Sequence, residues 1–329
     1  MPPPINHPSL RPYPVKVHNY LPRPTPDNPN QDPNRPLQVY EHLTTFSSLD
    51  SNPQNALVFI GGLGDGPHTI PYVRRLAEHL ATTEGGKKWG VFEARLTSAF
   101  TGFGHSSLKQ DAKELGDLVR YLRSEVVGSK GKVVLMGHST GCQDCLEYGT
   151  KYGPEWEEEE RVDGFVLQGP VSDREAVTVS EDMEEVRKSL AVAREMVAQE
   201  RGEEVIRREE MPKGWRAIPV TAGRWCSLVD IGGDDDYFSS DLPDSTLQQI
   251  WGKLSKPVLI LPSGKDEWVP AKIDVPALMK RWMSFCAPGI ASPLSGFIPG
   301  ANHRVDNEEG KVWLNETVGK FLEEVDARE

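Results

Sequence analysis

Several features are scarce in this chain of 329 residues, and each scarcity excludes a class of protein. The four cysteines, Cys142, Cys145, Cys226 and Cys286, are too few for a disulfide scaffold in a chain of this length. No stretch contains eighteen consecutive apolar residues, so we expect no membrane span. The residues after Met1 lack a basic region followed by an apolar run. We therefore expect no signal peptide and a cytoplasmic protein.

Basic residues are outnumbered, with 37 Lys and Arg against 49 Asp and Glu and a net charge of −12. This balance disfavours nucleic acid and anionic membrane surfaces as partners, because both repel an acidic protein. Neutral or cationic small molecules are easier to accept. The composition therefore favours a small-molecule substrate.

The spacing Cys142-x-x-Cys145 suggests a metal or redox site, and the run Asp234–Asp236 a cation site, although three consecutive carboxylates point in different directions and a turn is the better interpretation of the run. No second Cys/His pair stands at zinc spacing, and both cysteines lie within a predicted helix, where their thiols would pack against a sheet. We expect no metal and no organic cofactor.

The motif Gly-x-Ser-x-Gly at Gly137–Gly141 follows the apolar run 133–136 and precedes a helical segment. A strand, a sharp turn and a helix are the context of a nucleophile elbow. The two glycines are needed because a β-carbon would clash where the strand and helix meet. We predict that Ser139 is a nucleophile and that the Thr140 amide, at a helix N-terminus, stabilises an oxyanion.

Apolar strand patterns alternate with helical patterns along most of the chain, which predicts a mostly parallel sheet flanked by helices. Residues 1–36 read as a proline-rich arm that contains a candidate edge strand at 15–20, and residues 37–329 as one domain. Further strands are expected at 37–43, 56–60, 89–96, 133–136, 164–168, 257–261 and 296–299. Helices are expected at 72–82, 109–125, 275–285 and 308–325.

An acidic helical insertion, at about 172–252, separates two of the predicted strands. Residues 155–210 hold 18 acidic and 8 basic residues. We interpret this segment as a cap over the active site, with residues 221–241 as a loop. The alternative is a helical face that is merely solvated.

The glycine-rich loop Gly61–Gly66 follows the strand at 56–60. It fits neither the dinucleotide fingerprint, because Pro67 stands where the third glycine would be, nor a P-loop. We favour an oxyanion loop with the amide of Leu63 as donor and Gly62 as the alternative. Gly62, His105 and Trp268 are also expected to contact substrate.

Ser139, Asp266 and His303 follow strands in the chain order serine, acid, histidine. His303 would act as the base for Ser139, and Asp266 would hold its imidazole tautomer. Glu267 and Asp173 are the alternative acids.

Four motifs together resemble the α/β-hydrolase superfamily: Gly137–Gly141, Gly61–Gly66, Gly264–Pro270 and Ala301–Arg304. From about Leu37 to the C-terminus, the chain is also similar to fungal siderophore esterases of the SidJ type. One departure is that Gly61 stands where many esterases carry a histidine, which leaves the oxyanion loop without that side-chain brace.

This resemblance implies hydrolysis of ester bonds in fusarinine-type ferric siderophores, so that iron is released inside the cell. An acidic cap would attract the free amines of such substrates. Two alternatives stay open. One is an enzyme that acts on other carboxylesters, lactones or amides, and the other is a ligand-binding protein that keeps the fold without catalysis.

Overall fold

The computed structural model describes residues 12–23, 34–44, 49–153 and 155–328. Of the predicted N-terminal arm, residues 1–11 and 24–33 lie outside the described part of the chain. The candidate edge strand within the arm is confirmed as β1, Val15–Tyr20. This strand pairs antiparallel with the next one, so part of the arm belongs to the central sheet.

The described residues form a seven-stranded sheet in the order β1-β2-β4-β3-β5-β6-β7. The pairs β1–β2 and β2–β4 are antiparallel, and all the other pairs are parallel. The strands after β1 are β2 Leu37–His42, β3 Asn55–Ile60, β4 Trp89–Arg95, β5 Val133–His138, β6 Gly164–Gln168 and β7 Val258–Leu261. Strands β3, β5, β6 and β7 are buried along their whole length, as apolar runs in a doubly covered sheet must be.

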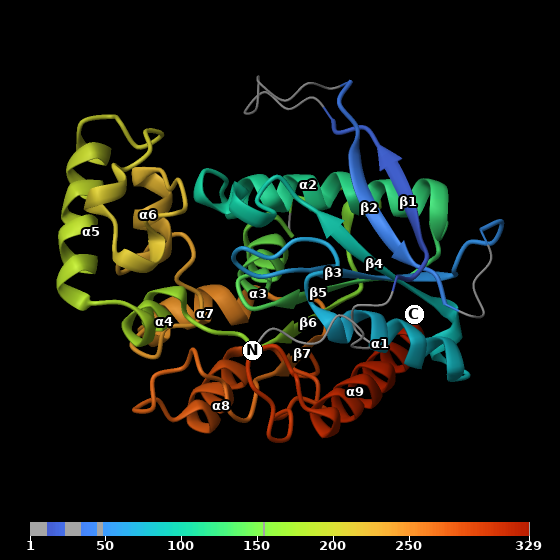
Figure 1. The fold of residues 1–329 in the computed structure, drawn as a ribbon. Helices are drawn as coiled ribbons and strands as arrows, with labels where there is room; N and C mark the ends of the chain where they lie inside the picture. The colour runs from blue at the N-terminus through green and yellow to red at the C-terminus, as the bar shows by residue number, and fades with distance from the viewer. Residues whose placement is uncertain (1–11, 24–33, 45–48, 154, 329) are drawn as a thin grey trace.

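Helices cover both faces of the sheet (Figure 1). Helices α2 and α3 pack on one face, and α1 and α9 pack on the other. The helices outside the insertion are α1 Pro71–Thr82, α2 Leu108–Tyr121, α3 Gly141–Glu147, α8 Val275–Phe285 and α9 Glu308–Asp326. This arrangement confirms the predicted α/β-hydrolase fold, and each of these helices lies where the apolar spacing predicts one.

The predicted strand at 296–299 is wrong. Only an isolated parallel bridge between Ser263 and Ile298 forms there. Ile298 donates its N–H to the carbonyl of Pro262 at 2.9 Å, but Pro299 has no N–H and Gly300 has a φ of +59°. The Gly296 amide also donates to the carbonyl of Ile260 at 3.1 Å, and the chain turns away after Ile298 because the left-handed Gly300 does not continue the ladder.

Four helices lie between β6 and β7, the place of the predicted cap: α4 Asp173–Ser180, α5 Met183–Ala198, α6 Ala222–Val229 and α7 Asp244–Ile250. Helices α5 and α6 stand to one side of the sheet (Figure 1) and share a hydrophobic core with Trp225 at its centre. The expected loop at 221–241 is wrong in part. Thr221 caps α6 by accepting a hydrogen bond from the Arg224 amide, and burial of Trp225 and Leu228 holds the helix in place.

Candidate active site

Ser139 lies between the end of β5 and the start of α3, in a left-handed backbone conformation with a φ of +54°. A β-carbon at Gly137 would come within 2.1 Å of the Gly141 carbonyl oxygen, and one at Gly141 within 2.4 Å of that of Ile60. The Ser139 amide donates to the carbonyl of Gln168 at 3.0 Å. This is the strained strand-to-helix turn that the motif predicts.

His303 and Asp266 form a buried pair. The Nδ1 atom of His303 lies 2.8 Å from Oδ2 of Asp266, and their side chains are only 6% and 5% exposed. Asp266 also accepts the Trp268 amide at Oδ1, at 3.0 Å. Glu267, one of the alternative acids, instead accepts the backbone N–H of His303 at 2.8 Å and so holds the loop. Asp266 is therefore the carboxylate that contacts the imidazole.

Asp173, the second alternative acid, lies at the start of α4 and has other partners. Its carboxylate accepts from Thr140 Oγ1 at 3.1 Å and from Gln143 Nε2 at 2.8 Å. Burial, with the nearby Asp235, raises the pKa of Asp173 to about 7. This carboxyl group braces the residue after Ser139 and changes its charge near neutral pH.

The oxyanion loop approaches Ser139 closely. A β-carbon at Gly62 would lie 2.6 Å from the Ser139 β-carbon, so only glycine fits there. Among the described residues, the amides of Leu63 and Thr140 donate to no protein acceptor. Two free amides beside a serine hydroxyl are what an oxyanion hole requires.

The expectation that this loop lacks a side-chain brace is wrong, because Asp65 provides one. Its Oδ2 atom accepts the Gly62 amide at 3.2 Å, and its Oδ1 atom accepts from Thr69 Oγ1 at 2.9 Å and from Arg304 Nη1 at 3.1 Å. Arg304 follows His303 directly. One ion pair therefore links the oxyanion loop to the histidine loop. The sequence offers one hint of this pair: Asp65 in the oxyanion loop and Arg304 in the histidine loop are charged residues to which the predicted mechanism assigns no role.

Gln168 organises a polar network beneath the site that sequence reasoning missed. Its Oε1 atom accepts from the Tyr72 hydroxyl at 2.8 Å and lies 2.5 Å from His138 Nδ1. Its Nε2 atom donates to Ser263 Oγ and to the carbonyl of His303. Burial and the neighbouring His303 lower the pKa of His138 well below its usual range, so this second imidazole is neutral. The sequence offers one hint, a glutamine that ends an otherwise apolar strand.

A cavity of about 440 Å³ opens over Ser139. Among the predicted site residues, Leu63, Ser139, Trp268 and His303 line it together. Four carboxylates, Asp65, Asp173, Glu181 and Glu267, share the lining with one guanidinium, that of Arg304. Residues of α4 and α6 form another part of the wall, so the helices between β6 and β7 limit access to Ser139.

His105, predicted to contact substrate, is not brought to this cavity. It is exposed and lines a separate depression of about 860 Å³. The preceding turn is fixed because the Gly104 carbonyl accepts the Thr221 amide at 2.8 Å, and a β-carbon at Gly104 would meet the Pro219 carbonyl oxygen at 2.0 Å. The turn before His105 is thus fixed against the segment that leads into α6.

Cys142 and Cys145 are fully buried in α3. Burial raises the pKa of both thiols well above the usual range. The Cys142 thiol donates to the carbonyls of Gly137 and Gln168 at 3.3 Å. These thiols pack against the sheet, as predicted from their place in the helix.

A buried charge cluster lies where α6 packs against the body of the molecule. Arg224 donates to the carbonyl of Phe103 at 2.9 Å and to Asp235 at 2.5 Å. Burial raises the pKa of Asp111 to about 7, with the charge of Glu114 adding to the shift. It also raises the pKa of Asp144 well above the usual range. One arginine thus faces several buried carboxyl groups, and burial together with their mutual repulsion opposes the ionisation of all of them at once.

The sequence comparisons place the chain among known proteins. Residues 9–323 match a family described as "Protein of unknown function (DUF1749)". The chain belongs to this family. It is 32% identical over 336 residues to the fusarinine C esterase sidJ of Aspergillus fumigatus, covering 87% of this chain and 92% of that protein. It is 30% identical over 375 residues to the esterase AN6793 of Emericella nidulans, covering 96% of each.

A solved structure supports the same placement. The siderophore hydrolase EstB from Aspergillus fumigatus superimposes with a TM-score of 0.73 at 29% identity, covering 89% of this chain and 95% of that one. The fold and the named relatives are those of α/β-hydrolase esterases, which confirms the predicted enzyme class. Within the described residues, no helix is both long and apolar enough to cross a membrane.

Proposed function

We propose that this chain is a cytoplasmic serine esterase in which Ser139, His303 and Asp266 form a catalytic triad. The observation that carries the proposal is the shared cavity: it exposes Ser139 on its strained turn together with His303, whose Nδ1 lies 2.8 Å from Asp266. Asp266 occupies Nδ1, so Nε2 is the nitrogen left to exchange a proton with the serine.

The steps follow from this arrangement. His303 Nε2 takes the proton as Ser139 Oγ attacks the ester carbonyl, and the amides of Leu63 and Thr140 stabilise the oxyanion. Collapse of the tetrahedral intermediate breaks the ester bond, and His303 returns the proton to the departing alcohol. Water then cleaves the acyl-enzyme by the same route, releasing the acid and restoring Ser139.

We further propose that the substrate is an ester-linked siderophore of the fusarinine type, and that its hydrolysis releases iron inside the cell. The names of the sidJ and EstB relatives support this class. So does the wall of the cavity, where Glu181 and Glu267 present carboxylates that suit the free amines of an unacetylated fusarinine.

A fluorophosphonate probe tests the mechanism. We expect covalent labelling of the wild-type chain and none of Ser139→Ala. An unlabelled wild type would contradict the esterase assignment and favour a ligand-binding protein. The substrate is tested separately, by incubating the enzyme with ferric fusarinines, simple acyl esters, lactones and amides and detecting the products by mass spectrometry. Turnover of simple esters without cleavage of any siderophore would retain the mechanism and reject the proposed substrate.

A further inference from the structure

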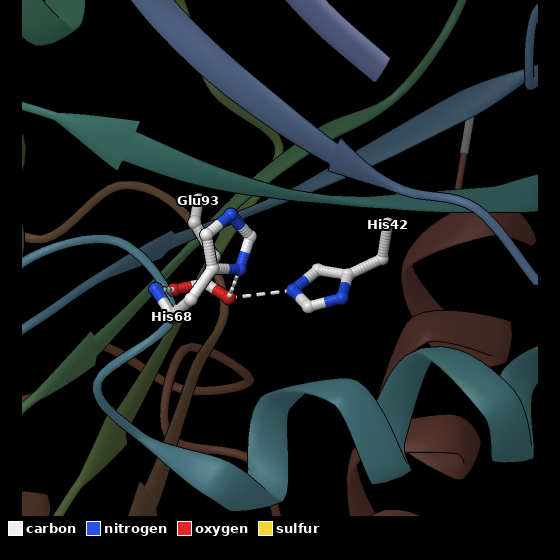
Figure 2. Close-up of side chains that lie close together, drawn as sticks. All are labelled: His42, His68 and Glu93. Atoms are coloured by element: carbon white, nitrogen blue, oxygen red, sulfur yellow. Dashed lines mark hydrogen bonds and ion pairs between the residues drawn. The ribbon is translucent and has the colours of Figure 1, made fainter. Parts of the chain in front are cut away.

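A second polar cluster lies at the other end of the oxyanion loop, outside the proposed catalytic machinery. His42 belongs to β2, Glu93 to β4 and His68 to the loop that leads into α1. The Oε1 atom of Glu93 lies 2.5 Å from His42 Nε2 and 3.1 Å from His68 Nδ1. Figure 2 shows the two imidazole rings meeting this one carboxylate oxygen.

We propose that His42, His68 and Glu93 form a binding site for a first-row divalent transition metal such as zinc. The three ligand atoms all lie within 4.8 Å of one another. Two ligands of a tetrahedral zinc ion are ~3.3 Å apart when each bond is about 2.0–2.1 Å long. The observed spacings of 2.5 and 3.1 Å are close enough to this value that small side-chain shifts would admit the ion.

The ligand set indicates which ions fit. Two imidazoles and one carboxylate suit zinc, iron(II) or cobalt(II), whereas calcium and magnesium prefer a shell of oxygen ligands. The Tyr13 hydroxyl lies 2.9 Å from His68 Nδ1, so it is near the place where the fourth ligand of the metal ion would lie. The Tyr13 ring also stacks on His42, with ring centroids 5.7 Å apart.

Backbone strain at His68 gives independent support. Its φ is +66°, a left-handed conformation that is uncommon for residues other than glycine, although histidine adopts it more often than most. Such strain persists where the surroundings require one placement of a side chain, as at ligand clamps. The Glu93 carboxylate accepts the His68 amide at 2.6 Å, so the same residue fixes both the backbone and the ring.

The outer nitrogens of the two rings bear on how a metal would bind. In the described part of the chain, His42 Nδ1 and His68 Nε2 have no hydrogen-bond partner. Without a metal, the His42 nitrogen that faces the Glu93 carboxylate carries the proton, because a carboxylate can only accept. A metal ion would displace that proton, and the ring can keep its remaining proton on the outer nitrogen, which leaves the inner nitrogen bare as a metal requires. The side chains of His42 and Glu93 are 2% exposed and that of His68 is 25% exposed, so His68 offers the route of entry.

A metal at this position would connect three segments. It would join the antiparallel strand β2 to β4 and to the loop that carries Leu63 and Asp65, because His68 lies three residues after Asp65. The inference stands apart from the proposed esterase function, since none of the three residues lines the Ser139 cavity.

The experiment measures metal content and affinity in the full chain. The protein is treated with a chelator, dialysed, and titrated with Zn²⁺ by calorimetry and with Co²⁺ by visible absorption. We expect one equivalent of Zn²⁺, a tetrahedral Co²⁺ spectrum and a rise in thermal midpoint on loading. If the wild-type chain took up no ion, the proposal would be refuted, and His42, His68 and Glu93 would form a hydrogen-bonded network only.

His68→Asn is the informative variant, because asparagine tolerates the left-handed conformation but its side chain is too short to replace the imidazole. We expect its Zn²⁺ affinity to fall about 100-fold or more, since even partners outside the ligand shell are worth about 10- to 100-fold. The control is His79→Gln, a histidine of α1 outside the cluster, which should keep full affinity. Equal affinity in His68→Asn and wild type would also refute the site. Circular dichroism of the metal-free variants shows that each one folds.

Discussion

Replacing Asp266 with asparagine tests the proposed triad most directly. The Oδ1 atom of Asp266 accepts the Trp268 amide at 3.0 Å, so the side-chain oxygen of the substituted asparagine should keep that position. Its NH₂ group would then face His303 Nδ1, where Oδ2 now lies at 2.8 Å. A donor at that point forces the imidazole proton onto Nε2, and His303 can no longer accept the proton of Ser139.

The expected loss is about 10⁴-fold in kcat, the effect of the wrong tautomer in a serine triad. At 1.36 kcal/mol for each factor of ten, this corresponds to about 5.5 kcal/mol of transition-state stabilisation. KM should change little, because Asp266 lies behind His303 and does not line the cavity. The assay is steady-state hydrolysis of a chromogenic ester, with the thermal midpoint checking that the variant is folded.

Asp173→Asn is the matched control. Among the described residues, Asp173 bonds to Thr140 and Gln143 and makes no hydrogen bond with the histidine, so its variant should lose far less activity. If Asp173→Asn lost about 10⁴-fold in kcat while Asp266→Asn stayed near wild type, the assignment of the acid would be refuted.

Two further predictions concern the carboxyl groups of Asp65 and Asp111. Asp65→Ala removes the acceptor of the Gly62 amide and the ion-pair partner of Arg304. The Leu63 amide should then shift, and kcat should fall by up to about 100-fold. Asp306→Ala, on the exposed side of the histidine loop, is the control, and an unchanged kcat in Asp65→Ala would contradict the role of Asp65 as a brace. Burial, with the charge of Glu114, raises the pKa of Asp111 from 3.8 to about 7, so the folded chain holds a proton that the unfolded chain releases between these values. The free energy of unfolding should therefore decrease as the pH rises from 4 to 7, and Asp111→Asn should flatten this slope in urea titrations; an identical slope in the variant would exclude Asp111 as its source.

The local sequence was sufficient to predict the fold and the core of the candidate site. Gly137, Ser139 and Gly141 predict the elbow because its sterics involve only the residues of one strand, one turn and one helix. Asp266 and His303 could be predicted because each follows an apolar segment, and such segments deliver their ends to one edge of a parallel sheet. The same reasoning erred at Ile298, where the left-handed Gly300 stops the pairing, and in the cap, where packing of Trp225 makes a helix of an expected loop.

Only the tertiary structure decided which distant groups meet. The Asp65–Arg304 pair joins residues 239 positions apart. His105, although its loop follows a strand of the same sheet, lines a different depression from Ser139. His42, His68 and Glu93 are spaced 26 and 25 positions apart, which matches no metal motif in a sequence. Their meeting depends on strand register, because β2 and β4 pair antiparallel and bring His42 and Glu93 together. The spacing of residues in the sequence determines which side chains meet within one turn or helix. Strand register and packing determine which side chains of distant segments meet.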